Sequence, residues 1–464
     1  MAKPNTQAPG VARHPGHSVA DTFAADEVAP PAPLLEQHYS FLGDEPIPAT
    51  RYSSDEFALR EEQAVWGHVW QWVCREEHIP DAGDNYVFDI GPWSVIVVRG
   101  EDGQLRAFHN RCTHRGTRLL EAEGLGFSQG FACPFHGWRW QLDGVLSSLP
   151  GGWDFPHVSP DSHSLQSVSC DTWSGFVFIN IDPHCQPLHE YLGPMVPHFE
   201  HFPIGGRRIA VHVCKRLPAN WKAAQEAFME AYHNFETHDT PNGGNTQYDI
   251  LGEHVSRFMH NIGNYSPESL SDYPGRKWRD PVMTEEETLA MLGIFGVEGE
   301  LEEGQTARQK VARGLRVKLT EALGRDMSGT SEALLLDSIE YHLFPNMFFF
   351  PGIGIPMVYR FRPDPEKVDE CLFDLLVMEE VPEGEVVGEP PEPHYLDIEQ
   401  SYTEVPALAW LGQVYDEDTG NLQLQTRGLK SLGEQGITLG NYQEARIRHV
   451  HQTIEKYMEH FEQA

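Results

Sequence analysis

The sequence predicts an α+β protein in which a small all-β domain is inserted before a larger domain with an antiparallel sheet flanked by helices. Three observations lead to this fold class. Short β-like runs separated by turns such as EDG and LDG fill residues 72–181. A helical pattern then continues to Pro241. Strand-like runs return in SIEYHLFPNMFFFPG, PMVYRFRP and ECLFDLLVMEE before a helical C-terminal part.

Four segments are expected along the chain. Residues 1–34 are rich in Ala and Pro with little to bury, so we expect a disordered N-terminal arm. Residues 35–70 carry helical periodicity, and we assign them to the larger domain as its N-terminal helical segment. Residues 71–185 form the all-β domain, and residues 186–464 form the rest of the larger domain.

The composition restricts the kinds of molecule that the protein is expected to bind. The 464 residues contain 34 basic and 69 acidic side chains, a net charge of −35, which argues against nucleic acid or an anionic membrane as partner. A solvated acidic surface or docking to a basic electron-transfer protein explains this charge. The chain has no secretory signal or membrane-spanning run, and its seven cysteines follow no disulfide spacing. We therefore expect a cytoplasmic protein with reduced thiols.

Two loops of the β region each combine one cysteine with one histidine. Cys112 and His114 are two positions apart in NRCTHRG, and Cys133 and His136 are three apart in CPFHGWRW. Zinc accepts such ligands, but zinc modules usually pair Cys with Cys and His with His in sequence. One thiolate and one imidazole from each loop instead suit a [2Fe-2S] cluster in which one iron takes both thiolates and the other both imidazoles.

A second group of candidate ligands lies in the helical pattern. Glu230 and His233 are three positions apart and share a helix face, whereas His233 and His238 are five apart. At that spacing two side chains diverge by about 140° on an ideal helix. Joint binding of one metal therefore requires the helix to widen or end near His238, and the following THDTPNGG supplies an end.

If the two histidines bind one metal ion, a carboxylate ligand is still needed to complete the site. Iron(II) oxygenases favour a face of two histidines and one carboxylate with open positions for O₂. Asp416, Glu417 and Asp418 in VYDEDTGNLQ are the candidates, and composition does not choose among them. An acidic turn before a helix is the ordinary interpretation of this run.

The motifs NRCTHRG, CPFHGWRW and NWKAAQEAFMEAYHNFETH together resemble the large subunit of the Rieske non-heme iron aromatic-ring-hydroxylating oxygenases. The resemblance covers residues 40 to 460. Its acidic pair followed by two residues and Asn is similar to residues 417–421 and selects Asp418. The resemblance implies one Rieske cluster at Cys112, His114, Cys133 and His136, and one mononuclear Fe(II) at His233, His238 and Asp418.

The resemblance also implies a trimeric ring. In it the cluster of one subunit lies beside the mononuclear iron of its neighbour, and an acidic residue hydrogen-bonds to a ligand of each. His136, Glu230 and His233 match those positions. The bridge is Glu here, whereas many ring dioxygenases use Asp, and Ala227 stands where Asn is often found. These departures leave demethylating and monohydroxylating relatives open.

The implied function is that of a terminal oxygenase, which uses O₂ and electrons to hydroxylate an aromatic or other apolar substrate, with ring dihydroxylation favoured. The chain lacks a Gly-rich dinucleotide fingerprint, so NAD(P)H acts through a ferredoxin or reductase partner. A small β subunit is an open question. An electron carrier and a zinc-stabilised binding protein are the alternatives from other classes. Residues 346–356 are candidates for lining the substrate pocket, although core packing is the favoured role for each single Phe among them. Residues 242–335 are candidates for controlling access to the pocket.

Overall fold

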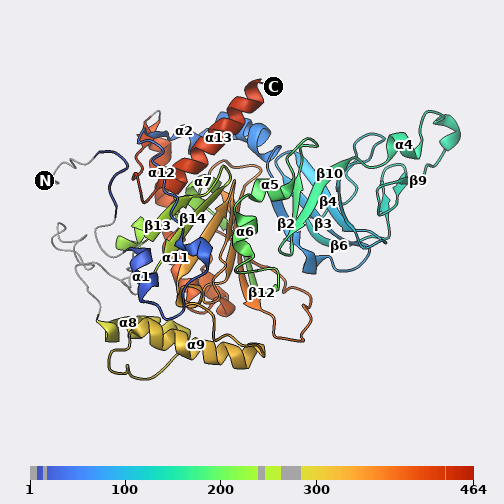
Figure 1. Cartoon of the computed structure of the whole chain (residues 1–464). Coiled ribbons are helices and arrows are strands. Elements are labelled where there is room, and N and C mark those ends of the chain that lie inside the picture. The colour runs from blue at the N-terminus through green and yellow to red at the C-terminus, as the bar shows by residue number, and fades with distance from the viewer. Residues whose placement is uncertain (1–7, 14–17, 239–245, 263–283, 434, 464) are drawn as a thin grey trace. The chain divides into compact units, whose positions relative to one another are not determined.

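The computed structural model describes residues 8–13, 18–238, 246–262, 284–433 and 435–463 (Figure 1). It divides into two compact units. The smaller comprises Arg60–Tyr191 and Val387–Pro390, and the larger comprises Met1–Leu59, Leu192–Val386 and Pro391–Gln463. The predicted α+β fold class, with an all-β domain and a larger domain built on an antiparallel sheet with helices, is confirmed.

The smaller unit is built from antiparallel strands in two sheets. The larger sheet has the order β2-β11-β10-β5-β4-β3-β6, and a second sheet has the order β7-β8-β9. Apolar side chains of both sheets form one core with Cys112 and Cys133. The strands are β2 (Gln71–Arg75), β3 (Asp84–Ile90), β4 (Trp93–Arg99), β5 (Leu105–His109), β6 (Gly124–Phe127), β7 (Phe131–Ala132), β8 (Arg139–Trp140), β9 (Leu146–Ser148), β10 (Ser167–Trp173) and β11 (Phe176–Asn180).

The larger unit is organised around an eight-stranded sheet with the order β13-β14-β15-β16-β17-β18-β12-β19. Neighbouring strands are antiparallel except β12 and β19, which are parallel. The strands are β12 (Arg207–Leu217), β13 (Thr246–Ile250), β14 (Val255–His260), β15 (Ser338–Leu343), β16 (Met347–Phe349), β17 (Met357–Pro363), β18 (Cys371–Glu380) and β19 (His394–Leu396). The central strands are almost wholly buried, which explains their nearly continuous apolar sequence.

Helices cover this sheet. In Figure 1 the long C-terminal helix α13, drawn in red, and helices α8 and α9, drawn in yellow, lie at opposite ends of the sheet. The main helices are α7 (Trp221–Glu226), α8 (Glu285–Met291), α9 (Ala307–Leu323), α10 (Glu332–Leu336), α11 (Leu411–Gly420), α12 (Leu422–Leu432) and α13 (Ala445–Gln463). No helix in the described part of the chain is both long enough and apolar enough to span a membrane.

The expected disordered arm over residues 1–34 is wrong for its second half. Helix α1 (Val19–Ala25) begins with a capping box at Ser18, and Phe23 is buried. Just after this helix, Asp26 pairs with Arg308 of α9. The composition of the arm predicts little burial, but it does not reveal the cation that a distant helix offers.

The segment boundaries also differ from the expected ones. The smaller unit begins at Arg60 and ends at Tyr191, so it extends beyond residues 71–185 on both sides. The helical segment expected at 35–70 is divided between the units. Helix α3 (Asp55–Glu61) is followed directly by a π-helical turn at Glu62–Trp66, which belongs to the smaller unit.

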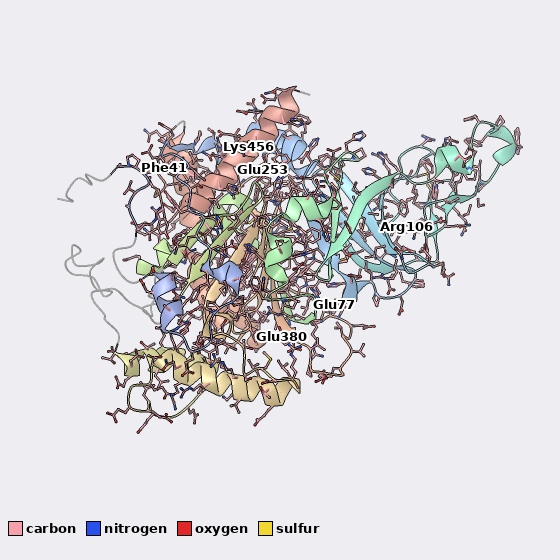
Figure 2. All side chains as sticks on the ribbon, in the orientation of Figure 1. Phe41, Glu77, Arg106, Glu253, Glu380 and Lys456 are labelled. Carbon is pink, nitrogen blue, oxygen red and sulfur yellow. The ribbon has the colours of Figure 1, made fainter. Side chains whose placement is uncertain are left out.

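The ion pairs of the larger unit range from exposed to buried. Lys456 of α13 and Glu253 lie 3.7 Å apart with both side chains exposed (Figure 2). In contrast, the guanidinium of Arg308 donates to both carboxylate oxygens of Asp337, at 2.6 and 2.9 Å, and to Asp26 at 2.9 and 3.1 Å. Burial raises the pKa of Asp26 although Arg308 acts to lower it. The two carboxylates therefore depend on this cation.

We predict that Arg308→Met strongly destabilises the attachment of the segments at Asp26 and Asp337 to α9, because it leaves these two buried carboxylates without their cation. Breaking a buried pair typically costs about 3–5 kcal/mol. Hydrogen exchange is the suitable measurement, because it reports local opening of α1 and α9 in a chain with two units.

Arg313→Met is the matched control. Arg313 lies on the same helix and pairs with Glu27, but its side chain is 51% exposed. Its loss should cost less than about 1 kcal/mol. Equal exchange rates in the two variants would contradict a specific role for Arg308.

Candidate metal centres

The first centre is formed by two loops with the same backbone pattern. In the loop after β5, the Cys112 N–H donates to the Thr117 carbonyl at 2.8 Å, and the Gly116 N–H donates to the Cys112 carbonyl at 2.9 Å. Between β7 and β8, Cys133, Trp138 and Gly137 repeat these bonds at 2.8 and 3.0 Å. Both glycines have positive φ, +79° and +75°, a conformation that residues with a Cβ rarely adopt.

The loops bring like side chains together. The Cys112 and Cys133 thiols are buried and interact with each other. The His114 and His136 rings lie 4.8 Å apart between centroids. His114 stacks on Trp138 at 4.9 Å, which fixes the plane of its ring. The expected grouping of thiol with thiol and imidazole with imidazole is therefore present in the fold.

The donor atoms of this centre suit a metal cluster. The His114 Nδ1 is buried without a hydrogen-bond partner among the described residues, as a metal-binding nitrogen is before loading. Burial acts to raise the pKa of Cys133, but the backbone N–H groups of Phe135 and His136 outweigh it and lower this pKa. These amides would likewise stabilise a thiolate bound to iron. The residues fit a Rieske cluster.

The second centre begins where a helix ends earlier than expected. The sequence predicts a helix to Pro241, but α7 ends at Glu226 and a 3₁₀ turn follows at Tyr232–Phe235. Pro241 itself lies outside the described residues. The Glu230 carboxylate stabilises the new turn, because it accepts the backbone N–H groups of Tyr232 and His233 at its start.

Neighbouring elements hold this loop in place. The Ala231 N–H donates to the Tyr248 hydroxyl of β13 at 3.1 Å. The Met229 carbonyl accepts from Arg446 of α13, also at 3.1 Å. Residues on either side of Glu230 are thus fixed to the sheet and to the C-terminal helix. The three-residue spacing predicted on a helix becomes a spacing on an anchored turn.

His233, His238 and Asp418 converge on one point. One donor atom from each lies within 4.8 Å of the others. Asp418 Oδ1 is 3.4 Å from His233 Nε2 and 3.1 Å from His238 Nε2. This oxygen is buried and makes no well-formed hydrogen bond within the described part of the chain. The three donors have the composition and placement of a facial site for iron(II).

Both histidines are held from behind by a carboxylate. His233 Nδ1 lies 2.9 Å from Glu230 Oε1, and His238 Nδ1 lies 2.7 Å from Glu417 Oε2. When Nδ1 carries the proton and donates it, the lone pair of Nε2 faces the common point. The predicted contact of Glu230 with His233 is present, although on a turn rather than along a helix.

The electrostatics of this site favour a cation. Burial acts to lower the pKa of His233, but Asp418 and Glu230 outweigh it and raise this pKa to about 10. Burial acts to raise the pKa of Asp418, and the two imidazoles instead lower it. The site therefore stabilises positive charge at the place where a metal ion would supply it.

The three consecutive acids have different partners because they lie on a helix rather than in an acidic turn before one. All three are in α11, where successive side chains are about 100° apart. Asp416 accepts from the Tyr402 N–H at 2.9 Å and from Ser401. Glu417 binds His238, and Asp418 alone reaches the convergence point. From the sequence, Glu417 is only one of three candidate ligands. No pattern of neighbouring residues indicates its contact with His238.

The apolar strand considered as a pocket lining is part of the core, which is the role favoured for its phenylalanines. Met347, Phe348 and Phe349 of β16 are completely buried, and Phe348 packs on Tyr359 and Phe361 of β17. The expected access region, 242–335, lies partly outside the described residues; its described part includes β13, β14, α8 and α9.

Comparison with known proteins adds independent information. The family model of the Rieske [2Fe-2S] domain matches residues 69–155. The chain is 33% identical to the carnitine monooxygenase oxygenase subunit of Escherichia coli (strain K12) over 189 residues, 40% of this chain and 50% of that protein. It is 32% identical to the large oxygenase component of salicylate 5-hydroxylase of Ralstonia sp over 208 residues, 41% of this chain and 48% of that protein. These matches span about half the length of each relative.

Solved structures share the fold. A quaternary ammonium Rieske monooxygenase aligns with a TM-score of 0.61 at 18% identity, over 89% of this chain and 95% of that one. Naphthalene 1,2-dioxygenase from Rhodococcus sp., bound to indole, aligns with a TM-score of 0.60 at 19% identity, over 89% and 94%.

The larger unit carries the second family match. The family model described as the ring hydroxylating alpha subunit (catalytic domain) matches residues 205–460, more than half of the chain. Together the two matched domains imply a Rieske cluster and a mononuclear iron. The resemblance seen in the motifs is thereby confirmed: the chain belongs to the ring-hydroxylating alpha subunit family and carries a Rieske [2Fe-2S] domain before its catalytic domain.

Proposed function

We propose that this chain is the terminal component of a Rieske oxygenase, which hydroxylates an aromatic or other apolar organic substrate. The observation that carries the proposal is the convergence of His233, His238 and Asp418 in a chain that also has a Rieske domain. We assign these three residues to the mononuclear Fe(II), and Cys112, His114, Cys133 and His136 to the cluster. When bound, the cluster supplies single electrons and the mononuclear iron supplies O₂ activation.

The protein's own residues prepare this site. A facial set of three ligands leaves the opposite side of the metal open for O₂ and for the substrate. Glu230 and Glu417 keep the two imidazoles turned toward the metal, and Glu417 is itself held by Gln413 at 3.0 Å. Rigid placement of ligands lowers the reorganisation that metal binding and reaction require.

Both one-oxygen and two-oxygen insertion fit this site. Relatives of each type match the chain, including a carnitine monooxygenase and the alpha subunit of biphenyl 2,3-dioxygenase from Rhodococcus jostii (strain RHA1). We favour ring dihydroxylation, and the Glu at position 230 keeps monohydroxylation or oxidative demethylation as the alternative. A substrate panel with ¹⁸O₂ and mass analysis of the products distinguishes them. Absence of label in any product would contradict the oxygenase proposal.

Electrons come from a ferredoxin or reductase in this proposal, and NAD(P)H acts only through that partner. We further propose a homotrimer, with or without a small β subunit, located in the cytoplasm where NAD(P)H is supplied. The exposed His136 side chain supports contact of the cluster with another molecule. Inter-subunit electron transfer is also ascribed to a structurally similar quaternary ammonium Rieske monooxygenase that oxidises carnitine.

Cys112→Ser or His136→Ala should abolish the visible absorption of the cluster, because the iron–sulfur assembly is lost without one of its ligands. Absorption spectra with iron and acid-labile sulfide assays measure this loss. Cys170→Ser is the control, since Cys170 belongs to neither loop but lies on β10 opposite Ile179, and the substitution should leave the spectrum unchanged. A Cys112→Ser protein with the wild-type spectrum would exclude this cysteine as a ligand. Zinc without iron in the wild type would favour a zinc-stabilised protein.

Asp418→Ala should release the mononuclear iron and leave the two irons of the cluster in place. The iron content per chain should therefore fall by about one third, with an unchanged cluster spectrum. Asp416→Ala is the matched control, because its carboxylate points to Ser401 and Tyr402 and it should retain all the iron. The opposite pattern would assign the ligand to Asp416. Full iron in both variants would point to Glu417.

Glu230→Gln should leave metal content near normal and still slow electron delivery to the mononuclear iron severely. The amide retains the volume of the side chain but removes the negative charge. That charge favours the imidazole of His233 and, in the proposed trimer, the imidazole of His136 from the neighbouring subunit. Stopped-flow reoxidation of the reduced cluster, with substrate and O₂ present, measures this step. Glu417→Gln is the control, because it removes the same charge from behind His238. If Glu230→Gln slows reoxidation more than Glu417→Gln does, the difference is due to the connection that Glu230 makes between the two metal centres. Wild-type reoxidation in Glu230→Gln would rule the bridge out.

A further inference from the structure

One buried histidine beside the second centre has an unpaired nitrogen. His260 is the last residue of β14 and is 5% exposed. Its ring stacks on Phe258 of the same strand, with centroids 6.0 Å apart and planes 9° apart. Its Nδ1 lies 2.8 Å from the Thr246 hydroxyl, whereas its Nε2 is buried and has no hydrogen-bond partner within the described ranges. Most polar atoms buried to this degree are bonded, so this nitrogen calls for an explanation.

The ring lies on the face of the β13–β14 hairpin that supports the metal-binding loop. Phe258 and His260 are two positions apart and so share one face of β14. Phe258 packs edge-on against Tyr248, whose hydroxyl accepts the Ala231 N–H of the metal-binding loop. Burial lowers the pKa of His260 to about 4, and the charges of His233 and His238 contribute to the shift. His260 is therefore neutral near pH 7 and lies within electrostatic range of both histidines.

The Thr246 hydroxyl lies at the other nitrogen of the ring. It is 2.8 Å from His260 Nδ1 and has a hydrogen that it can donate to that nitrogen. In this arrangement Nδ1 is the acceptor, the proton of the neutral ring is on Nε2, and Nε2 is a hydrogen-bond donor.

Resting on the proposed oxygenase function, we propose that His260 orients the substrate: its Nε2–H donates a hydrogen bond to an oxygen acceptor of the organic molecule held beside the mononuclear iron. The substrate class that fits best is an apolar compound with a neutral carbonyl, hydroxyl or ether oxygen. Glu230, Glu417 and Asp418 make this region acidic, which disfavours a carboxylate. Arg446, which lies over Phe258, is already bonded to Glu340, Ser256 and Met229.

A matched pair of probes tests the hydrogen bond. 2-Indanone and indane have nearly the same shape and differ by one carbonyl oxygen. Their affinities for the iron-loaded holoenzyme are measured by anaerobic equilibrium dialysis, so that no turnover is needed. The ratio of the two dissociation constants in wild type and in His260→Phe gives the coupling between the carbonyl and the imidazole, because differences in hydrophobic transfer cancel.

We expect the preference for 2-indanone over indane to fall about fivefold in His260→Phe, the effect of one neutral hydrogen bond of about 1 kcal/mol. His260→Gln, which restores an N–H donor, should recover part of the preference. His254→Phe is the control, because this buried histidine contacts Tyr457 and Phe344 rather than the metal-binding loop, and it should leave the ratio unchanged. Iron content and the cluster spectrum verify that each variant is folded.

Several results overturn the proposal. These are no measurable binding of 2-indanone by the wild type, a ratio unchanged in His260→Phe, or an equal change in His254→Phe. If His260→Phe does not fold, Thr246→Val replaces it: loss of the hydroxyl frees the tautomer, so the preference should fall, and an unchanged ratio counts against the proposal. If the coupling is measured but no ¹⁸O is incorporated, only the oxygenase proposal is contradicted. A chain that incorporates ¹⁸O without the coupling excludes only this role of His260.

Discussion

The two hydrogen bonds between carboxylates and imidazoles behind the second centre determine what the rest of the structure can do. An imidazole on a turn can rotate about its Cβ bond and present either nitrogen. Glu230 and Glu417 remove this freedom, because each accepts the Nδ1 proton of one histidine at 2.9 or 2.7 Å. Both Nε2 atoms are then directed to the same oxygen of Asp418. Without these two bonds, the three donor atoms would lie near one another but would not be oriented toward one metal position.

The sheet and its helices supply the precision that these bonds require. Asp418 is three residues after Tyr415 on α11, and the Tyr415 hydroxyl is 2.6 Å from that of Tyr359 on β17. The helix that carries the carboxylate is therefore joined to the centre of the sheet. The histidine turn is attached to β13 through Tyr248 and to α13 through Arg446. The histidine loop and α11, far apart in the sequence, meet because each is attached to the same sheet.

The sequence predicts well those features that depend on interactions within a few residues. The Cys/His loops fold through bonds within a few residues, with a glycine at the one position in each loop that requires positive φ, so the motif alone indicates the geometry. The turn after α7 depends in part on distant residues: Glu230 stabilises it locally, but Tyr248 and Arg446 hold it from other elements. The three acids at 416–418 look equivalent in sequence. Only the orientation of α11 against Ser401 and the two histidines gives each of them a different partner.

The buried acids of the larger unit differ in the direction in which their pKa is shifted. Burial raises the pKa of Glu226 to about 8, and those of Glu340 and Glu444 to about 7, so near neutral pH these carboxyls are partly or mostly protonated. The opposite holds at the metal centre, where the two imidazoles lower the pKa of Asp418. Asp418 therefore keeps its negative charge, and this charge faces the two histidines. A divalent cation is the species that best neutralises it, and a neutral substrate can lie beside the resulting centre at the smallest electrostatic cost.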